Sequence, residues 1–347
     1  MIARLTSAEP AAQGDQSRPT QIRAAQIDLD DVDLAVIDEL QQNGRVSYAE
    51  VARRIGVTEK TVRRRVLQLI ENRFITITAV TDPASLGFDF MALALVSTDG
   101  SRSPVELAAE LASLSEADYV TVTTGPFAVQ VELMGVSAAE IYDTVDTKIR
   151  PVDGVASVEL LPYLRLHYQQ ARFSHHGRPD GIRPRELDHI DRAIVSHLAV
   201  DGRAPFLDLA SELGVSEAKI RFRYGKLVES GAVRVMCIVN PLRLGYRFTS
   251  WVLVNVGATG RAQNVAEALT SLPAVSYVAV TAGRCDVLAE VVAATGEELI
   301  TILDDQIRPI PGVAGVESWL YVALHYKAIR PRHLGASAGH ASDIQIV

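Results

Sequence analysis

Two basic segments of the chain contain residue types that can bind nucleic acid. Residues 58–75 have the sequence TEKTVRRRVLQLIENRFI, within a chain of 347 residues whose formal net charge is −8. Residues 216–233 have the sequence SEAKIRFRYGKLVESGAV and repeat that pattern, with Phe222 where the first segment has Arg64. Lysine and arginine neutralise DNA phosphates and can donate hydrogen bonds to guanine in the major groove. These segments are the first candidates for a functional surface.

The helical period gathers the basic side chains of the first segment on one face. A helix that begins at Thr58 would run to about Asn72, and its apolar face would hold Val62, Val66 and Leu69. The opposite face would hold Lys60, Thr61, Arg63 and Arg64. This pattern favours DNA contact, and the alternative interpretation is a helix surface that only faces solvent.

Two shorter helical patterns precede this segment and would position it. DDVDLAVIDELQQNG has apolar residues at spacings of three and four, and Gly44 closes it. Ser47, with Glu50 three residues later, fits a capping box that begins a second helix, which Gly56 ends. The turn before the third helix is then only about three residues long, as in a helix-turn-helix.

The whole arrangement occurs twice in the chain. An offset of 158 residues, without a gap, aligns residues 29–172 with the second half, and about three in ten positions are identical. IRPVDGVASVE, for example, aligns with IRPIPGVAGVE. We predict a mobile N-terminal tail (1–28), a first helix-turn-helix (29–76), a first αβ sandwich (77–168), a linker (169–186), a second helix-turn-helix (187–234), a second αβ sandwich (235–327) and a mobile C-terminal tail (328–347).

The second part of each copy alternates strand and helix patterns. In the first copy the order is strand, helix, strand, strand, helix, strand, from FDFMALALVST to GVASVELLPYLRLHY. This is the order of a ferredoxin-like sandwich, an antiparallel sheet with both helices on one face. FDFMALALV and FTSWVLVNV are also apolar on the other face, so we expect a second domain to cover it. The predicted fold class is therefore α+β, with two tandem copies of each module.

Composition excludes several other classes of protein. No apolar run is long enough to span a bilayer, and the first residues have no signal-peptide core, so we expect a cytoplasmic protein without a membrane partner. The two cysteines form no CxxC pair. His167 and His325 occupy equivalent strand positions, which is more typical of packing than of a metal site. The chain has no GxSxG, P-loop or GxGxxG pattern, so we predict no enzyme activity, metal or cofactor.

The sequence GRVSYAEVARRIGVTEKTVRRRVLQLIENRFI, followed by this sandwich and a Thr-Gly loop between its second and third strands, resembles the Lrp/AsnC (feast/famine) family of regulators. The resemblance covers both copies and implies a tandem member. It implies that the helix-turn-helix binds double-stranded DNA, and that the sandwich dimerises and binds an amino acid. The DNA-contacting residues it implies are Thr58, Lys60, Thr61, Arg63, Arg64, Ser216, Lys219 and Arg221, whereas Arg65 would brace the module by pairing with an acidic neighbour.

The resemblance also implies an effector loop in each sandwich, of the form Thr-Gly, any residue, aromatic, Asp. The first copy has Thr124, Gly125 and Phe127, but Ala128 in place of Asp. The second copy keeps Gly283 and Asp286 and changes the other positions. This split is compatible with four alternatives: two equivalent sites, one composite site, a drifted specificity, or no site.

The second loop, TAGRCDV, has polar groups that suit an amino acid. After Thr281, Gly283 would expose backbone N–H groups, Arg284 would bind a carboxylate and Asp286 an amine. The alternative is a tight turn with a solvated arginine and an aspartate bonded to its own loop.

The two helix-turn-helix modules differ in charge. Residues 47–73 hold seven Lys and Arg against three Glu, a net charge of +4, whereas residues 205–231 hold four against four, a net charge of 0. We therefore predict a transcriptional regulator that contacts DNA mainly through its first module, while Phe222 in the second packs against another domain. Because operators usually bind symmetric pairs of recognition helices, we also expect a homodimer or a larger homo-oligomer.

Two other functions are compatible with this architecture. Sirohaem decarboxylases resemble Lrp/AsnC proteins and can be fused in tandem, but they typically have a histidine-bearing THNY stretch and an aromatic-rich third strand. This chain has ADYVTVTTGPFAVQVEL and VSYVAVTAGRCDVLAEV in those places. The other alternative is a sensing or scaffold protein that does not bind DNA.

Overall fold

The computed structural model describes residues 29–81, 88–169, 187–326 and 344–346. The predicted N-terminal tail, most of the predicted linker and most of the predicted C-terminal tail lie outside the described residues. None of the described helices is long and apolar enough to cross a membrane.

The first helix-turn-helix consists of α1 (Asp31–Gln42), α2 (Tyr48–Ile55) and α3 (Glu59–Glu71). Each helix begins at a side-chain cap, because polar residues there accept the backbone N–H groups that the first turn leaves unpaired. Thr58 accepts the N–H of Thr61 in this way. The predicted helix starts and the short turn between α2 and α3 are confirmed.

The second helix-turn-helix repeats this arrangement with α6 (His189–Val200), α7 (Phe206–Leu213) and α8 (Glu217–Glu229). A strand follows each module, β1 (Ile75–Thr81) in the first copy and β6 (Val233–Val239) in the second. These strands pair with each other in antiparallel register. The sequence analysis did not predict this pairing, which joins the two modules into one body.

Each copy then continues with the predicted strand and helix order. The elements of the first copy are β2 (Phe90–Thr98), α4 (Pro104–Ala112), β3 (Ala117–Thr123), β4 (Val129–Gly135), α5 (Ala138–Thr144) with the π-helical turn η2 (Val145–Ile149), and β5 (Val155–Gln169). Those of the second are β7 (Ser250–Val256), α9 (Ala262–Thr270), β8 (Val275–Thr281), β9 (Val287–Val291), α10 (Gly296–Thr301) with η3 (Ile302–Ile307), and β10 (Val313–Tyr326). The predicted α+β fold is confirmed.

The two sheets join into one closed barrel because the last strand of each copy crosses to the other copy. Up to Pro162, β5 pairs with β2 of its own copy, and from Tyr163 it pairs with β8. Likewise β10 pairs with β7 up to Leu320 and with β3 from Tyr321. The described strands therefore follow the order β10-β3-β4-β2-β5-β8-β9-β7, and β7 returns to β10.

A further short strand, β11 (Ile344–Ile346), lies within the segment that the sequence predicts as a C-terminal tail. It pairs with the end of β10, from Leu324 to Tyr326, on the side that β3 leaves open. Unpaired strand edges accept an added strand readily, since their N–H and C=O groups lack partners.

The barrel interior is the apolar face that the sequence left uncovered. Side chains from both copies, among them Leu93, Leu161, Trp251 and Trp319, are buried there together. Each copy also has a core of its own between its sheet and its helices. The prediction that a second domain covers the open sheet face is confirmed, and that domain belongs to the same chain.

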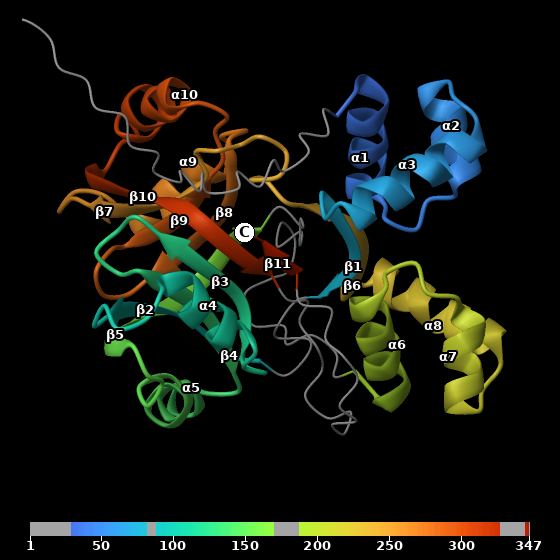
Figure 1. The fold of residues 1–347 in the computed structure, drawn as a ribbon, viewed down its shortest axis with the longest axis horizontal. Helices are drawn as coiled ribbons and strands as arrows, with labels where there is room; N and C mark the ends of the chain where they lie inside the picture. Colours follow the sequence, from blue (N-terminus) through green and yellow to red (C-terminus); the bar gives the residue numbers. More distant parts are fainter. Residues whose placement is uncertain (1–28, 82–87, 170–186, 327–343, 347) are drawn as a thin grey trace, which may run out of the picture.

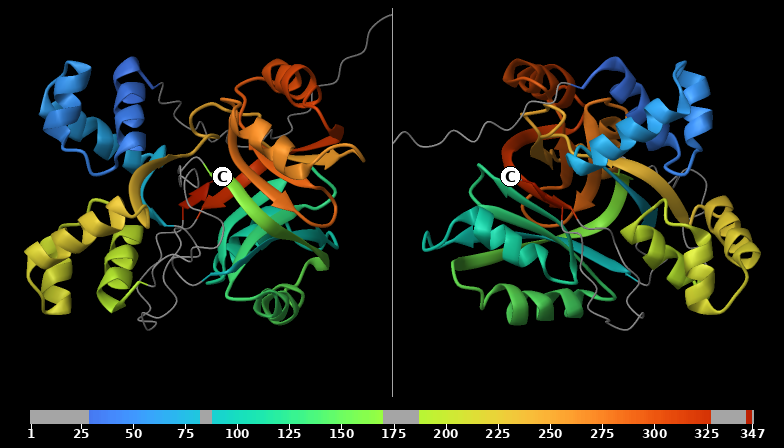
Figure 2. Two further views of the ribbon diagram at one scale, coloured as in Figure 1. Left: turned by 180° about the vertical axis from the view of Figure 1, so that it is seen from behind. Right: turned by 45° about the vertical axis from the view of Figure 1, so that its right-hand side comes forward.

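The molecule has two halves. In Figure 1 the two helix-turn-helix modules lie side by side at one end, the barrel lies at the other, and β1 and β6 lie between them. Figure 2 shows the same division from behind, with α9 and α10 on the outside of the barrel. Any site between the halves can couple the barrel to the helix-turn-helix modules.

Candidate nucleic-acid interface and effector site

The outward face of α3 is exposed and basic. Val62, Val66 and Leu69 are buried against the module, while Lys60, Arg63 and Arg64 are exposed. Arg63 Nη2 donates to Glu59 Oε1 at 3.3 Å, one turn earlier. Lys60 and Arg64 form no ion pair with any residue in the described part of the chain. Their charges are thus available to phosphates.

Thr58 and Thr61 lie at the start of α3, but their hydroxyl groups already have partners. The two oxygens are 2.8 Å apart, and Thr58 Oγ1 also accepts the N–H of Thr61 at 3.2 Å. The predicted DNA-contacting residues of the first module therefore lie on one surface, although Thr58 also caps the helix.

Arg65 braces the module, as the sequence analysis predicted. Its guanidinium pairs with Asp30 and with Asp33, both at the start of α1. The amide of Asp33, and then the charge and hydrogen bond of Arg65, lower the pKa of Asp30. Arg223 makes the equivalent contacts in the second module, with Asp188 and Asp191. This arginine holds the recognition helix against the first helix in both copies.

The outward face of α8 differs from that of α3. Ser216 caps the helix by accepting the N–H of Lys219, and the side chains of Lys219 and Arg221 are exposed. Arg221 pairs with Glu217, as Arg63 does with Glu59. Phe222 is 67% exposed, so the hypothesis that it packs against another domain is wrong within the described residues. The face of α8 is less basic and has an exposed aromatic ring.

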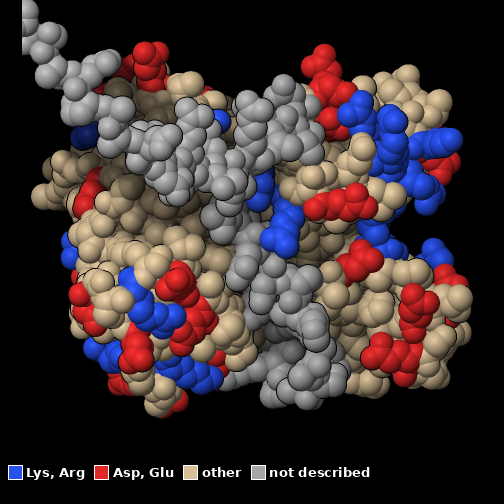
Figure 3. Space-filling model, viewed as in Figure 1, with Lys and Arg blue, Asp and Glu red and all other residues tan. Residues whose placement is uncertain are grey.

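Charge on the molecular surface follows the same asymmetry. Figure 3 shows Lys and Arg side chains gathered over the first helix-turn-helix, whereas Asp and Glu are more prominent over the second in that view. The sequence windows gave net charges of +4 and 0 for these modules. A phosphate backbone would therefore meet a favourable field mainly at the first module.

Two arginines fasten the modules to each other by reciprocal contacts. Arg45 Nη1 donates to the carbonyl of Gly202 at 2.6 Å and to that of Ala204 at 3.1 Å. Arg203, its equivalent, donates to the carbonyls of Gly44 and Val46. The guanidinium of Arg45 also lies 4.2 Å from the ring centroid of Phe206, and that of Arg203 lies 4.2 Å from Tyr48. These contacts and the β1–β6 ladder hold α3 and α8 in one fixed relation.

The first predicted effector loop lies against the second copy. Thr124 donates its N–H to the carbonyl of Leu320 at 2.9 Å and accepts the N–H of Leu320 on its hydroxyl. Gly125 lies on the ring of Trp319 so closely that a Cβ would be 2.5 Å from the Trp319 Cγ atom. Only glycine fits here, which makes the conformation of this loop depend on β10.

The second predicted effector loop lies against the first copy, and its polar groups already have partners. Arg284 pairs with Glu159 at 2.9 Å, and Thr281 donates to the carbonyl of Cys285 at 2.7 Å. Asp286 accepts the N–H of Val256 at 2.7 Å. The carboxylate of Asp286 therefore holds the loop, whereas the sequence analysis assigned it to a ligand amine.

The two loops lie close together. The Arg284 guanidinium is 4.8 Å from the ring centroid of Phe127 in the first loop, and Phe127 packs against Trp319 with ring centroids 5.8 Å apart. Gly283 has a φ of 126°, and a Cβ there would be in van der Waals contact with Leu161 at 3.4 Å, so this loop also lies against β5 of the first copy. This placement favours one composite surface over two separate loops.

The barrel also contains buried carboxyls that the sequence analysis did not single out. Glu132 accepts hydrogen bonds from the hydroxyl groups of Tyr163 and Tyr277, each at 2.8 Å. Burial, and then the charge of Glu132, raises the pKa of both tyrosines well above the ordinary range. Asp118 lies beside Glu132, and burial followed by the charge of Glu132 raises its pKa well above 3.8.

Glu290 is the equivalent of Glu132 in the second copy. It accepts hydrogen bonds from Tyr321 at 2.7 Å, from Tyr119 and from Ser276. The signal in the sequence was a glutamate at the same position of two mostly apolar strands, VQVEL and VLAEV. Such a position is normally apolar, since burying a carboxyl is unfavourable unless it is paired.

Comparisons with known proteins agree with the two-module architecture. The AsnC-type helix-turn-helix domain matches residues 29–70 and 187–228, and an AsnC-type C-terminal dimeric alpha+beta barrel domain matches residues 259–328. The HTH-type transcriptional regulator FL11 of Pyrococcus abyssi is 36% identical over 140 residues, which are 40% of this chain and 91% of that protein. The HTH-type transcriptional regulator LrpA of Pyrococcus horikoshii is 32% identical over 131 residues, 38% of this chain and 92% of that protein.

A solved structure matches the full tandem architecture. The siroheme decarboxylase NirDL has a TM-score of 0.59 and 16% identity, and the match covers 88% of this chain and 94% of that chain. At this identity the likeness shows a shared fold alone. The regulators are more similar in sequence and match over nearly their whole length, so the chain belongs to the Lrp/AsnC family of helix-turn-helix transcriptional regulators, with the helix-turn-helix present twice.

Proposed function

We propose that the protein acts in the cytoplasm as a sequence-specific regulator that binds double-stranded DNA mainly through α3. The main observation in support is the outward face of α3, where Lys60 and Arg64 are exposed and form no ion pair with another described residue. The equivalent positions of α8 hold Ala218 and Phe222. Cationic side chains on a recognition helix supply both phosphate contacts and hydrogen bonds to bases.

The second module would then contact a different half-site. Both recognition helices belong to one chain and are held together by Arg45 and Arg203, so one chain presents two DNA-contacting helices. Phe222 can make an apolar contact with a thymine methyl group, whereas Arg64 can donate to guanine. The proposed operator therefore has two unlike halves, one richer in guanine contacts and one in thymine contacts.

Selection of genomic fragments by the purified full-length protein tests this function. We expect enrichment of a common sequence with two unlike halves, and a retarded band for each enriched fragment. Lys60→Ala/Arg64→Ala should weaken binding, while Glu110→Gln, on the exposed surface of α4 far from α3, should not. Failure to retain any fragment would favour a sensing or scaffold protein without DNA binding.

We further propose that a small amino acid or a related carboxylate binds at the composite loop surface formed by Thr124, Gly125, Thr281, Gly283, Arg284 and Asp286. Support comes from the Arg284–Glu159 ion pair, whose side chains are both more than a third exposed. An exposed pair contributes only about 0–1 kcal/mol, so a ligand carboxylate can replace Glu159. Asp286 would act by holding the loop. Calorimetric titration with the common amino acids, on the wild type and on Arg284→Ala, tests this site.

The chemistry of the chain supports a non-enzymatic role without a cofactor. The described residues that line its large pocket include five carboxylic acids and one arginine. Such a wall would repel a polycarboxylate such as uroporphyrin, an analogue of which is present in a complex of NirDL. Mixing the protein with a tetrapyrrole and recording absorbance checks this point, and a shifted Soret band would contradict it.

Members of the family form oligomers, and we propose a homodimer or a larger homo-oligomer for this chain. The prediction from the sequence rested on a symmetric pair of recognition helices, and in the structure one chain already joins two helix-turn-helix modules through the β1–β6 ladder. A homo-oligomer must therefore use another surface. Light scattering at micromolar concentration, with and without DNA, measures the mass, and the mass of one chain in both conditions would contradict the proposal.

A further inference from the structure

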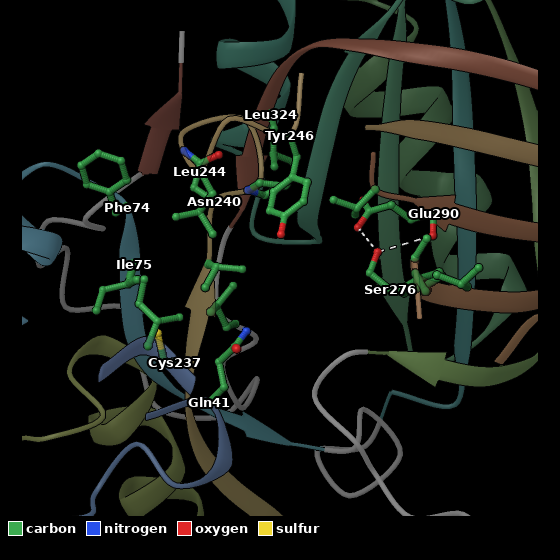
Figure 4. A pocket seen from close by; sticks show the side chains of 18 of the residues that line it. Gln41, Phe74, Ile75, Cys237, Asn240, Leu244, Tyr246, Ser276, Glu290 and Leu324 are labelled. Atoms are coloured by element: carbon green, nitrogen blue, oxygen red, sulfur yellow. Dashed lines mark hydrogen bonds between the residues drawn. The ribbon is translucent and has the colours of Figure 1, made fainter. Parts of the chain in front are cut away.

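A pocket of about 840 Å³ lies between the first helix-turn-helix and the barrel. Figure 4 shows Gln41, Phe74 and Ile75 on the side of the DNA-binding modules, and Ser276 and Glu290 on the side of the barrel. This volume suits a small organic ligand. The pocket is separate from the effector loops, because none of the loop residues from 124 to 128 or from 281 to 286 lines it.

Three buried carboxyls are among the residues that line the barrel side of the pocket. Asp118, Glu132 and Glu290 are 4%, 2% and 8% exposed. No ion pair joins any of them to a cationic side chain in the described ranges, and tyrosine and serine hydroxyl groups bond the two glutamates instead. Buried carboxyls are charged only where a cation or a metal pairs with them, so a cationic ligand in this pocket would favour their charged forms.

Two buried polar atoms of residues that line the pocket have no hydrogen-bond partner among the described residues. One is an acceptor, Asp118 Oδ1, and the other is a donor, Asn240 Nδ2. Both side chains belong to residues that are at most 5% exposed, and both residues line the pocket. Buried groups without a partner are uncommon in folded proteins, so these two atoms are candidates for hydrogen bonds to a ligand.

The space between these atoms is lined by apolar side chains. Leu244 and Tyr246 lie beside Asn240 in Figure 4, and Ile75 and Val239 belong to the wall formed by β1 and β6. A ligand that spans the pocket would therefore have an apolar stem. Within the described residues no group of acidic, histidine or cysteine side chains is placed to hold a metal ion, so the acids do not form a cation site of that kind.

We propose that this pocket binds a small organic amine whose ammonium group lies at Asp118, Glu132 and Glu290. Its apolar stem lies against β1, β6 and Leu244. A carbonyl or hydroxyl oxygen at its far end accepts from Asn240 Nδ2. This ligand differs in place and charge from the carboxylate proposed for the loops.

Binding in this pocket acts on DNA affinity through the geometry of the molecule. The lining residues come from α1, β1 and β6 on one side and from β3, β4, β8 and β9 on the other. A ligand that contacts both sides fixes the position of the first helix-turn-helix relative to the barrel. Because that module holds the basic face of α3, the occupied protein binds its operator with a different affinity.

Calorimetric titration of the full-length protein with ω-amino amides of increasing stem length tests the proposal. We expect one member of the series to bind, and two matched probes to bind weakly or not at all: the amide without the amine, and the alkylamine without the amide. Asp118→Asn and Glu290→Gln should each weaken binding by about tenfold or more, the loss expected for one hydrogen bond to a charged group. Glu110→Gln, on the exposed surface of α4 and outside the pocket lining, serves as the matched control and should bind like the wild type.

The probes on wild-type protein keep the test independent of the variants, whose folding is checked by near-ultraviolet circular dichroism. Two results would overturn the proposal. One is equal binding of the ω-amino amide and of the amide that lacks the amine, and the other is no binding by any member of the series. Operator binding is measured on the same samples. If the protein binds DNA but no amine, only the proposed amine site is refuted. If it binds an amine but no DNA, only the proposed DNA-binding function is refuted.

Discussion

Exchange of the outward face of α3 for that of α8 provides the most direct test of the proposed asymmetry. The double variant Lys60→Ala/Arg64→Phe introduces the residues that α8 has at the equivalent positions, Ala218 and Phe222. Both replaced side chains are exposed, and neither forms an ion pair with a described residue. The exchange should therefore leave the fold of the module intact and remove only contacts to DNA.

The structure sets the expected magnitude. Each phosphate contact contributes about 0.9 to the slope of log K against log salt concentration, so loss of two contacts should flatten the slope by about 1.8. Over a fourfold rise in salt concentration, the wild type should lose about tenfold more affinity than the variant does. The wild type should also bind more tightly at low salt.

Fluorescence anisotropy with a labelled fragment from the genomic selection, over a series of salt concentrations, measures both quantities. Arg63→Ala and Arg221→Ala form a matched pair, because each arginine is exposed and each pairs with a glutamate one turn earlier. We expect the larger loss from Arg63→Ala. The reciprocal variant Phe222→Arg should steepen the slope by about 0.9.

Equal losses from Arg63→Ala and Arg221→Ala would show that both modules contact DNA alike. An unchanged slope in the double variant would show that Lys60 and Arg64 do not contact phosphates. Either result would refute the reasoning from exposure and charge.

Three further predictions concern stability. Arg45→Ala removes charged hydrogen bonds between the modules and should lower the free energy of unfolding by about 2 kcal/mol in a denaturant titration; a loss within error of zero would contradict the proposed fastening role. Gly225→Ala adds a methyl group in open space on α8 and should stabilise the protein by about 1 kcal/mol. Gly125→Ala, in contrast, must displace Trp319. It should therefore lower the melting temperature and change tryptophan fluorescence. Burial, and then Glu132, raises the pKa of Asp118 in the folded state, so the folded state retains a proton that the unfolded state loses above about pH 3.8. Wild-type stability therefore falls as the pH rises from about 3.8 toward the pKa of Asp118 in the folded state. Asp118→Asn should melt at a higher temperature than the wild type at neutral pH, and this difference should shrink toward pH 3.8. A constant difference across that range would contradict this reasoning.

The local elements could be predicted from the sequence because their signals lie within a few residues. The N-caps at Ser47 and Thr58 and the left-handed turn at Gly56 depend only on neighbouring backbone groups. The period of Val62, Val66 and Leu69 likewise identifies the buried face of α3. The order of strands and helices in each copy follows from the same kind of pattern.

Strand partners could not be predicted, since an alternating pattern identifies the buried face of a strand and not its neighbour. The last strand of each copy begins in its own sheet and ends in the other one, with the change at Tyr163 and Tyr321. The pairing of β1 with β6 likewise joins residues about 160 positions apart. The crossing strands close the barrel, whereas β1 and β6 form a separate two-stranded sheet that joins the helix-turn-helix modules.

For the candidate site residues, features within one helix could likewise be predicted, whereas contacts between distant parts of the chain could not. Exposure of Lys60 and Arg64 could be predicted from the helical period alone. The partners of Arg284 and Asp286 could not, because Glu159 and the Val256 amide come from other parts of the fold. The acids of the pocket gave one signal, the repeated glutamate, but their neighbours Tyr163 and Tyr277 belong to different copies.

A tandem chain permits differences that a homodimer cannot have. In a homodimer every substitution appears on both sides of the twofold axis, so a change that helps one half-site must also suit the other. Here the axis is only approximate, and Arg64 and Phe222 occupy related positions with different chemistry. Asp118 and Ser276 likewise occupy related positions, so only the first copy has an acid at this position of the pocket lining. Duplication thus lets one module keep the basic DNA-contacting face while its partner and the barrel between them acquire other contacts.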